Sequence, residues 1–351
     1  MKGIAAALSI AVVQPAFTAF ATAATVAAAA QESPRPAATV DVAAVRKAIQ
    51  QLRRGQDVEE NLALLRAAVD QVPDAGSFAR DVGTLLLNEK LYEPAQGFLE
   101  IARERLPQDG VVAQQLGNAH VMQHHYAEAH EHLSAADRLL PPGLRPYVHL
   151  YLSMVLIGLQ KAEESEARAK RAIEEVRAWN AAQPPGAPRL DEIDFELNLA
   201  NVYQRFLRAD DALRVLDALD GRPMEQRDLA KSRLVRAQIL EARGDDAGAL
   251  AAFARQRELA PDDAAGAYEF ALYHVRRNRP AEARPLLERA TKLDPEHEGA
   301  HFNLARVLLR LGEKEQGEAV MARYHAIHGA RISAEVRLAE MRLRLRARPA
   351  R

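Results

Sequence analysis

Small and apolar residues recur along the chain at a fixed spacing. The series Gly83, Ala95, Leu99, Ala102 and Pro107 returns 34 residues later as Gly117, Ala129, Leu133, Ala136 and Pro141. A period of this length, with the same types of residue in the same order, is typical of a solenoid in which two-helix units stack on their neighbours. The pattern therefore predicts pairs of helices joined by short turns.

The period continues through most of the chain, with three insertions. Ala237, Ala271 and Ala305 lie 34 residues apart, whereas the earlier steps from Gly117 to Ser153, to Ala200 and to Ala237 are 36, 47 and 37 residues. These steps exceed the period by 2, 13 and 3. The register predicts eight units, which begin near Val42, Gly76, Gly110, Pro146, Ile193, Ala230, Ala264 and Glu298.

The motif residues resemble those of the tetratricopeptide repeat. The first half of that motif appears in Leu116-Gly117, in Leu199-Ala200 with Tyr203, and in Leu304-Ala305, and the second half in Ala283, Leu287, Ala290 and Pro295. The small residue allows two helices to cross closely while a large neighbour fills the adjoining space. The resemblance implies an all-α, right-handed superhelical solenoid of about eight helix-turn-helix units with a C-terminal capping helix. A content of 48% hydrophobic but only 5% aromatic residues agrees with a helical fold.

The register divides the chain into segments. Residues 42–183 form units 1–4 and residues 191–329 form units 5–8, separated by a proline-rich loop at 184–190 that cannot continue a helix. Residues 330–351 are predicted to form a basic capping helix and tail, in which Ile332, Val336, Ala339 and Leu343 share one helical face. This end of the chain carries seven arginines against two glutamates from Arg331 onward, so it could also contact an anionic lipid surface or an acidic partner.

The first 30 residues have a different character. Lys2 is followed by a stretch from Gly3 to Ala30 that contains no charged residue and ends in closely spaced alanines. This pattern predicts a cleaved secretory signal peptide, with cleavage favoured after Ala21 or Ala23, followed by a disordered linker at 31–41. The alternative is an uncleaved segment that tethers the protein to the inner membrane. Because the chain contains no cysteine, a lipid anchor on an N-terminal cysteine, a disulfide and a thiolate metal site are excluded.

Charge and motif content exclude several classes of function. Forty-seven basic residues nearly balance 48 acidic ones, so a nucleic-acid partner is not expected. The sequence contains no glycine-rich phosphate loop and no strand-turn-helix serine motif. We therefore expect no catalytic residues, no cofactor and no enzymatic activity.

A cluster of histidines offers a candidate metal site. Five of the eleven histidines are His120, His124, His125, His130 and His132. Within one helix, the four-residue spacing of His120 and His124 would bring both imidazoles to a common metal. In the repeat register, however, His120 takes the position that Leu86 and Tyr203 hold in other units, where a side chain packs between helices. We interpret the cluster as packing and surface, with a periplasmic metal-binding module as the alternative.

The resemblance also indicates where a partner would bind. In tetratricopeptide proteins the first helices line the concave face. The candidate partner contacts are therefore the residue directly after each small residue and the residue three positions before it. The candidate groove residues are Arg80, Thr84, Gln114, Asn118, Leu197, Asn201, Leu234, Gln238, Tyr268, Leu272, Phe302 and Arg306. The early units offer polar groups, whereas the later units offer an apolar stripe suited to a peptide. Some family members clamp a terminal carboxylate with lysine and asparagine; here Arg80 and Asn118 would have to do so without a lysine.

The sequence thus predicts a non-enzymatic scaffold for protein-protein interaction, exported to the periplasm. The partner would be a protein or peptide, for which the resemblance suggests a component of envelope assembly. Membrane contact is expected only through the N-terminal segment or the basic C-terminal helix.

Overall fold

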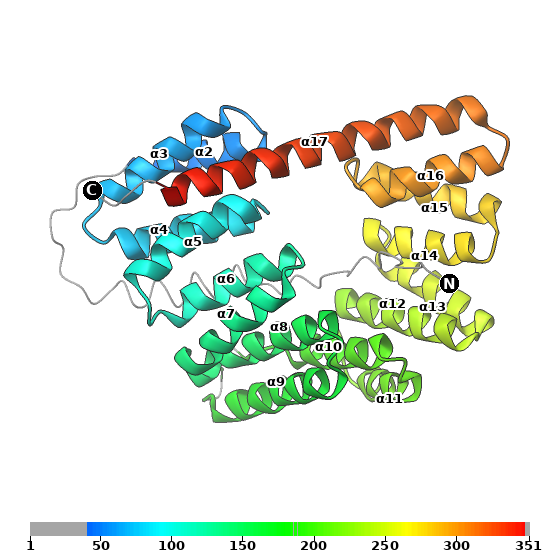
Figure 1. Ribbon diagram of the computed structural model, residues 1–351. Helices are drawn as coiled ribbons and strands as arrows, with labels where there is room; N and C mark the ends of the chain where they lie inside the picture. The colour runs from blue at the N-terminus through cyan, green and yellow to red at the C-terminus, as the bar shows by residue number, and fades with distance from the viewer. Residues whose placement is uncertain (1–40, 185, 188, 348–351) are drawn as a thin grey trace.

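The computed structural model describes residues 41–184, 186–187 and 189–347 (Figure 1). Sixteen α-helices and one short 3-10 helix account for the regular structure of these residues. The bounds are α2 Val42–Arg53, α3 Val58–Gln71, α4 Ala75–Asn88, α5 Tyr92–Arg105, α6 Gly110–Met122, α7 Tyr126–Leu139, η1 Pro142–Leu144, α8 Arg145–Gly158, α9 Ala162–Ala182, α10 Glu192–Arg205, α11 Ala209–Asp220, α12 Gln226–Arg243, α13 Asp246–Leu259, α14 Ala264–Arg276, α15 Pro280–Leu293, α16 Glu298–Arg310 and α17 Lys314–Ala347. The prediction of an all-α fold built from helix pairs is confirmed.

Aspartates define where several of the first helices begin. The Asp109 carboxylate accepts hydrogen bonds from the backbone N–H groups of Val111 and Val112, at 2.8 and 3.2 Å. The same capping is made by Asp41, Asp74 and Asp191 on other first helices, and by Asp245 on α13, a second helix. Because the first N–H groups of a helix have no partner within it, such a side chain stabilises the helix start.

The turns between paired helices repeat the register of the sequence. In the turns of the seven pairs from α4–α5 to α16–α17, one residue has a left-handed backbone, and these residues are Lys90, His124, Gln160, Leu207, Gly244, Asn278 and Gly312. Each lies seven positions after the small residue of its unit, so the insertions of 2, 13 and 3 residues appear unchanged in the backbone. A tight turn of this kind closes each pair at the same point.

The small positions hold paired helices together. A Cβ atom built on Gly117 would lie 2.5 Å from Leu133 Cγ, and one on Gly83 would lie 2.7 Å from Leu99 Cγ. Leu99 and Leu133 are both fully buried. Close approach of the first helix to the second thus depends on a missing side chain, as the repeat predicts.

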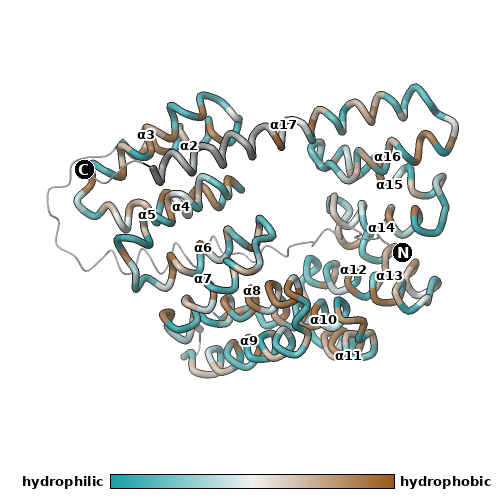
Figure 2. The backbone as a smooth tube through the Cα atoms, viewed as in Figure 1, coloured by the Kyte–Doolittle hydropathy of each residue, from teal (hydrophilic) through white to brown (hydrophobic). Residues whose placement is uncertain are grey.

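Three hydrophobic clusters follow one another along the chain. The first lies around Leu65 and Phe98, the second around Leu152 and Phe195, and the third around Phe253 and Leu287. Figure 2 shows that the hydrophobic positions gather most densely on α8 and α10, in the middle of the arc. The hydrophobic core therefore runs along the whole stack of helices and has no single centre.

The C-terminal helix differs from the prediction. No separate helix begins at residue 330, because Lys314–Ala347 form one continuous helix of 34 residues. This helix, α17, pairs with α16 and then reaches across the molecule to contact α5 (Figure 1). The stack of helices therefore forms an arc that α17 closes into a ring.

The predicted signal peptide at 1–30 and nearly all of the linker at 31–41 lie outside the described residues. Among the residues that are described, no helix has the length and apolar character needed to cross a membrane.

Candidate partner-binding surface

In the middle of the arc, the first helix of each pair faces the centre of the ring. Figure 1 shows α8 and α10 on the inner side of α9 and α11. Neighbouring first helices also touch, since α4 contacts α6, α6 contacts α8, and α8 contacts α10. From α4 to α12 the first helices thus form a continuous row, since α10 also contacts α12, and the candidate groove residues lie on these helices and on α14 and α16.

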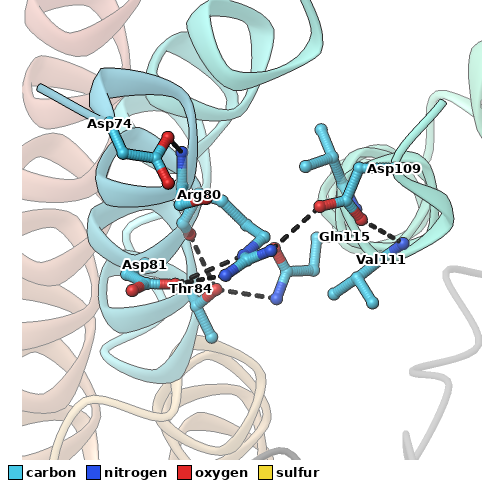
Figure 3. Close-up of polar contacts among 9 residues, drawn as sticks. Asp74, Arg80, Asp81, Thr84, Asp109, Val111 and Gln115 are labelled. Atoms are coloured by element: carbon cyan, nitrogen blue, oxygen red, sulfur yellow. Dashed lines mark hydrogen bonds and ion pairs between the residues drawn. The ribbon is translucent and has the colours of Figure 1, made fainter. Parts of the chain in front are cut away.

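At the N-terminal end of this row, a polar network joins α4 to α6 (Figure 3). Arg80 donates a hydrogen bond from Nη1 to Asp109 Oδ2 at 2.9 Å and contacts Asp81 Oδ1 at 3.3 Å. Thr84 Oγ1 donates to the Arg80 carbonyl at 2.8 Å and accepts a hydrogen bond of 2.7 Å from Gln115 Nε2. The Arg80 guanidinium therefore already has two carboxylate partners within the chain.

The environment of this network shifts the pKa of two groups. Burial by itself would lower the pKa of Arg80, but the hydrogen bond to Asp109 and the charge of Asp81 raise it above its ordinary value. Burial raises the pKa of the Asp81 carboxyl, although the Arg80 charge opposes this. The arginine is thus firmly charged and held between carboxylates, so it serves the contact between units and is not free to clamp a terminal carboxylate.

Gln114 and Asn118 lie one helical turn apart on α6, which places them on the same face. Gln114 is 3% exposed, and its Nε2 has no hydrogen-bond partner among the described residues. The Oδ1 of Asn118 is likewise buried without a described partner. This face of α6 therefore offers one donor and one acceptor that the described chain does not satisfy.

The apolar stripe predicted for the later units is not exposed at three of its positions. Leu197, Leu234 and Tyr268 are 1%, 9% and 8% exposed and belong to the hydrophobic clusters. The reason is the contact between neighbouring first helices, which the repeat pattern does not reveal. In these three units the residue three positions before the small residue packs against the next unit and does not face a partner.

The remaining candidates on the later helices differ from one another. Asn201 and Leu272 are half-buried, and Gln238 accepts a hydrogen bond of 3.2 Å from Gln204 Nε2. On α16, Phe302 and Arg306 are exposed, and the Arg306 guanidinium lies 5.4 Å from the centre of the Phe302 ring. An exposed aromatic ring and a cation thus stand together near the C-terminal end of the row.

Sequence reasoning missed a set of buried charges. Glu196 on α10 is 7% exposed and forms ion pairs with Arg177 and Arg222. Glu269 on α14 is 5% exposed, and burial raises the pKa of its carboxyl. Glu269 lies in an apolar stretch, residues 267–272, which could have marked it as buried, whereas Glu196 stands between Asp194 and Asn198 and gives no such signal.

The histidine cluster does not form a metal site in the described structure. Helix α6 ends at Met122, so His124 lies in the turn with a φ of 59° and does not share a helix face with His120. His120 stacks on His132 at 5.2 Å between ring centres, and Arg103 lies 3.0 Å from His132 Nδ1. Burial lowers the pKa of His132. Within the described ranges, no group of three or more histidine, cysteine, aspartate or glutamate side chains could hold a metal ion.

A cavity of about 410 Å³ lies among α13, α14 and α15. Its lining residues are Arg257, Phe270, His274, Glu282, Pro285, Leu286 and Arg289. None of them is a candidate groove residue, so this hollow is separate from the predicted inner surface.

Comparison with known protein families identifies the repeat in the later part of the chain. The family model described as tetratricopeptide repeat matches residues 268–329. This match covers 62 of the 351 residues, so it identifies the repeat in the part of the chain from α14 into α17. By sequence, no curated protein matches it.

Solved structures of other helical repeat proteins align with the chain at low identity. A chain of the APC/C hetero-tetramer Cut9-Hcn1 aligns with a TM-score of 0.50 and 15% identity, over 77% of this chain and 50% of that chain. A tetratricopeptide repeat protein from Parabacteroides merdae aligns with a TM-score of 0.47 and 12% identity, over 86% and 97%. PilF of Pseudomonas aeruginosa aligns with a TM-score of 0.41 and 18% identity, over 63% and 92%. At such identities the likeness concerns the fold alone.

Proposed function

We propose that this tetratricopeptide protein is a non-enzymatic scaffold that binds a polypeptide partner on the inner surface of its first helices. The observation that carries the proposal is the pair of unsatisfied amides on α6, Gln114 and Asn118. The family fold supports it, because stacked helix pairs present long concave surfaces to other proteins.

The chemistry of these two amides suits an extended polypeptide. Each residue of such a chain carries one N–H donor and one C=O acceptor, and the α6 face offers one acceptor and one donor in return. A buried polar group without a partner costs about 1–3 kcal/mol, and a ligand that pairs with it removes that cost. Phe302 and Arg306 on α16 provide a second contact point, for an apolar or acidic side chain of the same partner.

Photo-crosslinking tests where the partner binds. A photoreactive amino acid replaces Asn118 on the inner face, or Glu128 as a control on the outer face of α7, where the side chain is exposed. After irradiation in the native host, the captured proteins are identified by mass spectrometry. We expect a polypeptide captured from position 118 and absent from position 128. Identical captures from both positions would refute the assignment to the inner surface.

A paired substitution tests the role of the amides. Gln114→Met with Asn118→Leu keeps the side-chain size and removes the donor and acceptor, so capture through a probe at Phe302 should fall. The matched control is Glu128→Leu. Unchanged capture in the paired variant, with normal helical content by circular dichroism, would show that the amides do not bind the partner.

We further propose that the scaffold acts in the periplasm, with a component of envelope assembly as its partner. The support is the uncharged stretch from Gly3 to Ala30 after Lys2. N-terminal sequencing of the protein from cell fractions tests this proposal. A mature chain that starts after an alanine between Ala21 and Ala30 would support export, whereas a retained Met1 in the membrane fraction would indicate a tether.

A further inference from the structure

The outer face of α5 differs from that of every other second helix. Its three outer positions are Pro94, Gly97 and Ile101, which carry no charge. The residues in the same register positions are Glu128, Glu131 and Ala135 on α7, Glu164, Ala167 and Arg171 on α9, and Glu282, Pro285 and Arg289 on α15. A solvent-facing helix surface normally carries charged side chains, so the α5 sequence is suited to being covered.

The structure shows this face covered. Pro94, Gly97 and Ile101 are all buried, whereas Glu128 and Glu131 at the matching positions of α7 are exposed. Like other second helices, α5 contacts its own first helix, α4, and the next first helix, α6. Its additional neighbour is α17, from the opposite end of the chain (Figure 1).

The α17 helix has the length and the sequence for this contact. Its 34 residues extend about 51 Å at 1.5 Å per residue, enough to cross from α16 to α5. Helical periodicity puts Ile332, Val336, Ala339 and Leu343 in one stripe along its last half, of which Ile332, at the near end, is 43% exposed. The fold thus brings two helices with apolar stripes in their sequences, about 240 residues apart along the chain, into contact.

Charge and residue size favour the same pairing. The end of α17 is rich in arginine, and α5 carries Glu93, Glu100 and Glu104. Gly97 sits in the middle of the α5 stripe, where the missing side chain permits close approach of another helix.

We propose that the outer face of α5 is a docking surface for an amphipathic helix and that its occupant is residues 331–347 of the same chain. This segment acts as a clasp that holds the ring closed. If the scaffold binds its partner on the inner surface, as proposed above, the clasp controls whether a long polypeptide can enter from the side. The clasp itself is measured without any partner, so its failure and the failure of the proposed function are distinguishable.

Engineered cysteines test the contact directly, since the natural chain has none. Gly97→Cys is combined in turn with Val336→Cys, Ala339→Cys and Leu343→Cys, and each dilute protein is oxidised. We expect at least one pair to form a disulfide within a monomer, detected by mass spectrometry and by faster migration without reductant. The control replaces Gly97→Cys with Glu131→Cys, the matching outer position of α7, and should give no such product. Absence of a disulfide within the monomer, or a covalent dimer alone, would overturn the proposal; the dimer would mean that α17 docks on a second copy.

Opening the clasp gives an independent measurement. Val336→Glu with Leu343→Glu puts charges into the α17 stripe and leaves α5 intact, so a labelled peptide of residues 330–347 should find the surface vacant. In the natural chain, residues 331–347 occupy the α5 surface in most molecules, and the peptide can bind only the fraction in which this surface is free. We therefore expect the peptide to bind the variant about tenfold or more tightly than it binds the natural chain. Adding Gly97→Arg to the variant should abolish peptide binding, whereas adding Glu131→Arg should not. Equal affinity for the natural chain and the opened variant would overturn the proposal.

Discussion

The tightest contact of the repeat gives the sharpest prediction. Gly117→Ala adds one methyl group to α6, and its carbon would lie 2.5 Å from Leu133 Cγ, 2.7 Å from Leu133 Cδ2 and 3.2 Å from the Leu133 backbone nitrogen. Real Cβ atoms do not approach other heavy atoms to 2.5 Å. The clashing atom is the branch point of a fully buried leucine, so a rotation at the end of the side chain cannot relieve the overlap. The two helices must therefore move apart.

The expected magnitude follows from two opposing terms. Overpacking a buried contact costs about 1–3 kcal/mol, whereas replacing glycine by alanine inside a helix contributes about 1 kcal/mol in favour of folding. Gly329→Ala isolates the second term, because Gly329 lies within α17 with no atom within 4 Å of an added Cβ. The difference between the two variants is then the packing term, about 1–3 kcal/mol.

Urea unfolding followed by circular dichroism measures this difference for both variants and the natural chain. We expect Gly117→Ala to unfold at lower urea and Gly329→Ala at equal or higher urea. In Leu133→Ala the clashing atoms are absent, so Gly117→Ala made in that background should be neutral or stabilising. If Gly117→Ala is as stable as Gly329→Ala, helix crossing at this residue does not require glycine, and the packing explanation of the repeat is wrong.

Three further predictions follow from other parts of the structure. Leu207 is 85% exposed with a φ of 59°, so Leu207→Gly should raise stability by about 0.5–1 kcal/mol, measured by thermal unfolding, and a lower melting temperature would contradict the assigned strain. Arg80→Gln should lower the free energy of unfolding in urea by about 1–3 kcal/mol, because it leaves Asp109 without its ion pair. The control Arg53→Gln removes an exposed ion pair with Glu89 and should lower it by at most about 1 kcal/mol. Equal losses in the two variants would refute a structural role for Arg80. Burial raises the pKa of the Glu269 carboxyl above its ordinary value of 4.5, so this carboxyl binds its proton more tightly in the folded state than in the unfolded state. The buried charge therefore destabilises the fold at neutral pH, and this destabilisation disappears as the pH falls toward 4.5 and the carboxyl becomes protonated. Glu269→Gln should therefore exceed the natural chain in stability at pH 7 and lose that advantage near pH 4, and an advantage independent of pH would exclude this cause.

The repeat could be predicted from the sequence because packing imposes it on residue type. Gly83, Gly117 and their equivalents must be small wherever two helices cross, and the insertions appear as shifts in a fixed series. The boundary at residue 330 was wrong for a related reason. From Lys314 to Ala347 there is no proline, and Gly329 alone costs about 1 kcal/mol in a helix, which is not enough to end it.

The inner surface was predicted less well because a repeat constrains contacts within a unit more strongly than contacts between units. Leu197 and Tyr268 have the same relation to the small residue as Gln114, and only the packing of neighbouring first helices determines what each contacts.

The interpretation of His120 as a packing residue is confirmed by its burial, whereas its predicted place on a common helix with His124 is wrong. Helix ends depend on turn geometry, and a non-glycine residue in a left-handed turn gives little signal in a single sequence.

The closed ring could nevertheless have been inferred from a comparison of repeat positions that face outward. The inner pattern, meaning the positions that pack between the paired helices, is small or apolar in nearly every unit, so it cannot distinguish one unit from another. Outer positions are charged by default, and a unit whose outer stripe is Pro94, Gly97 and Ile101 must be covered by some element that the repeat itself does not supply. The described chain has one helix long enough to reach it, with a matching apolar stripe at its far end. In a solenoid, a break in the outer pattern is therefore evidence for a long-range contact, whereas the inner pattern is evidence only for the repeat.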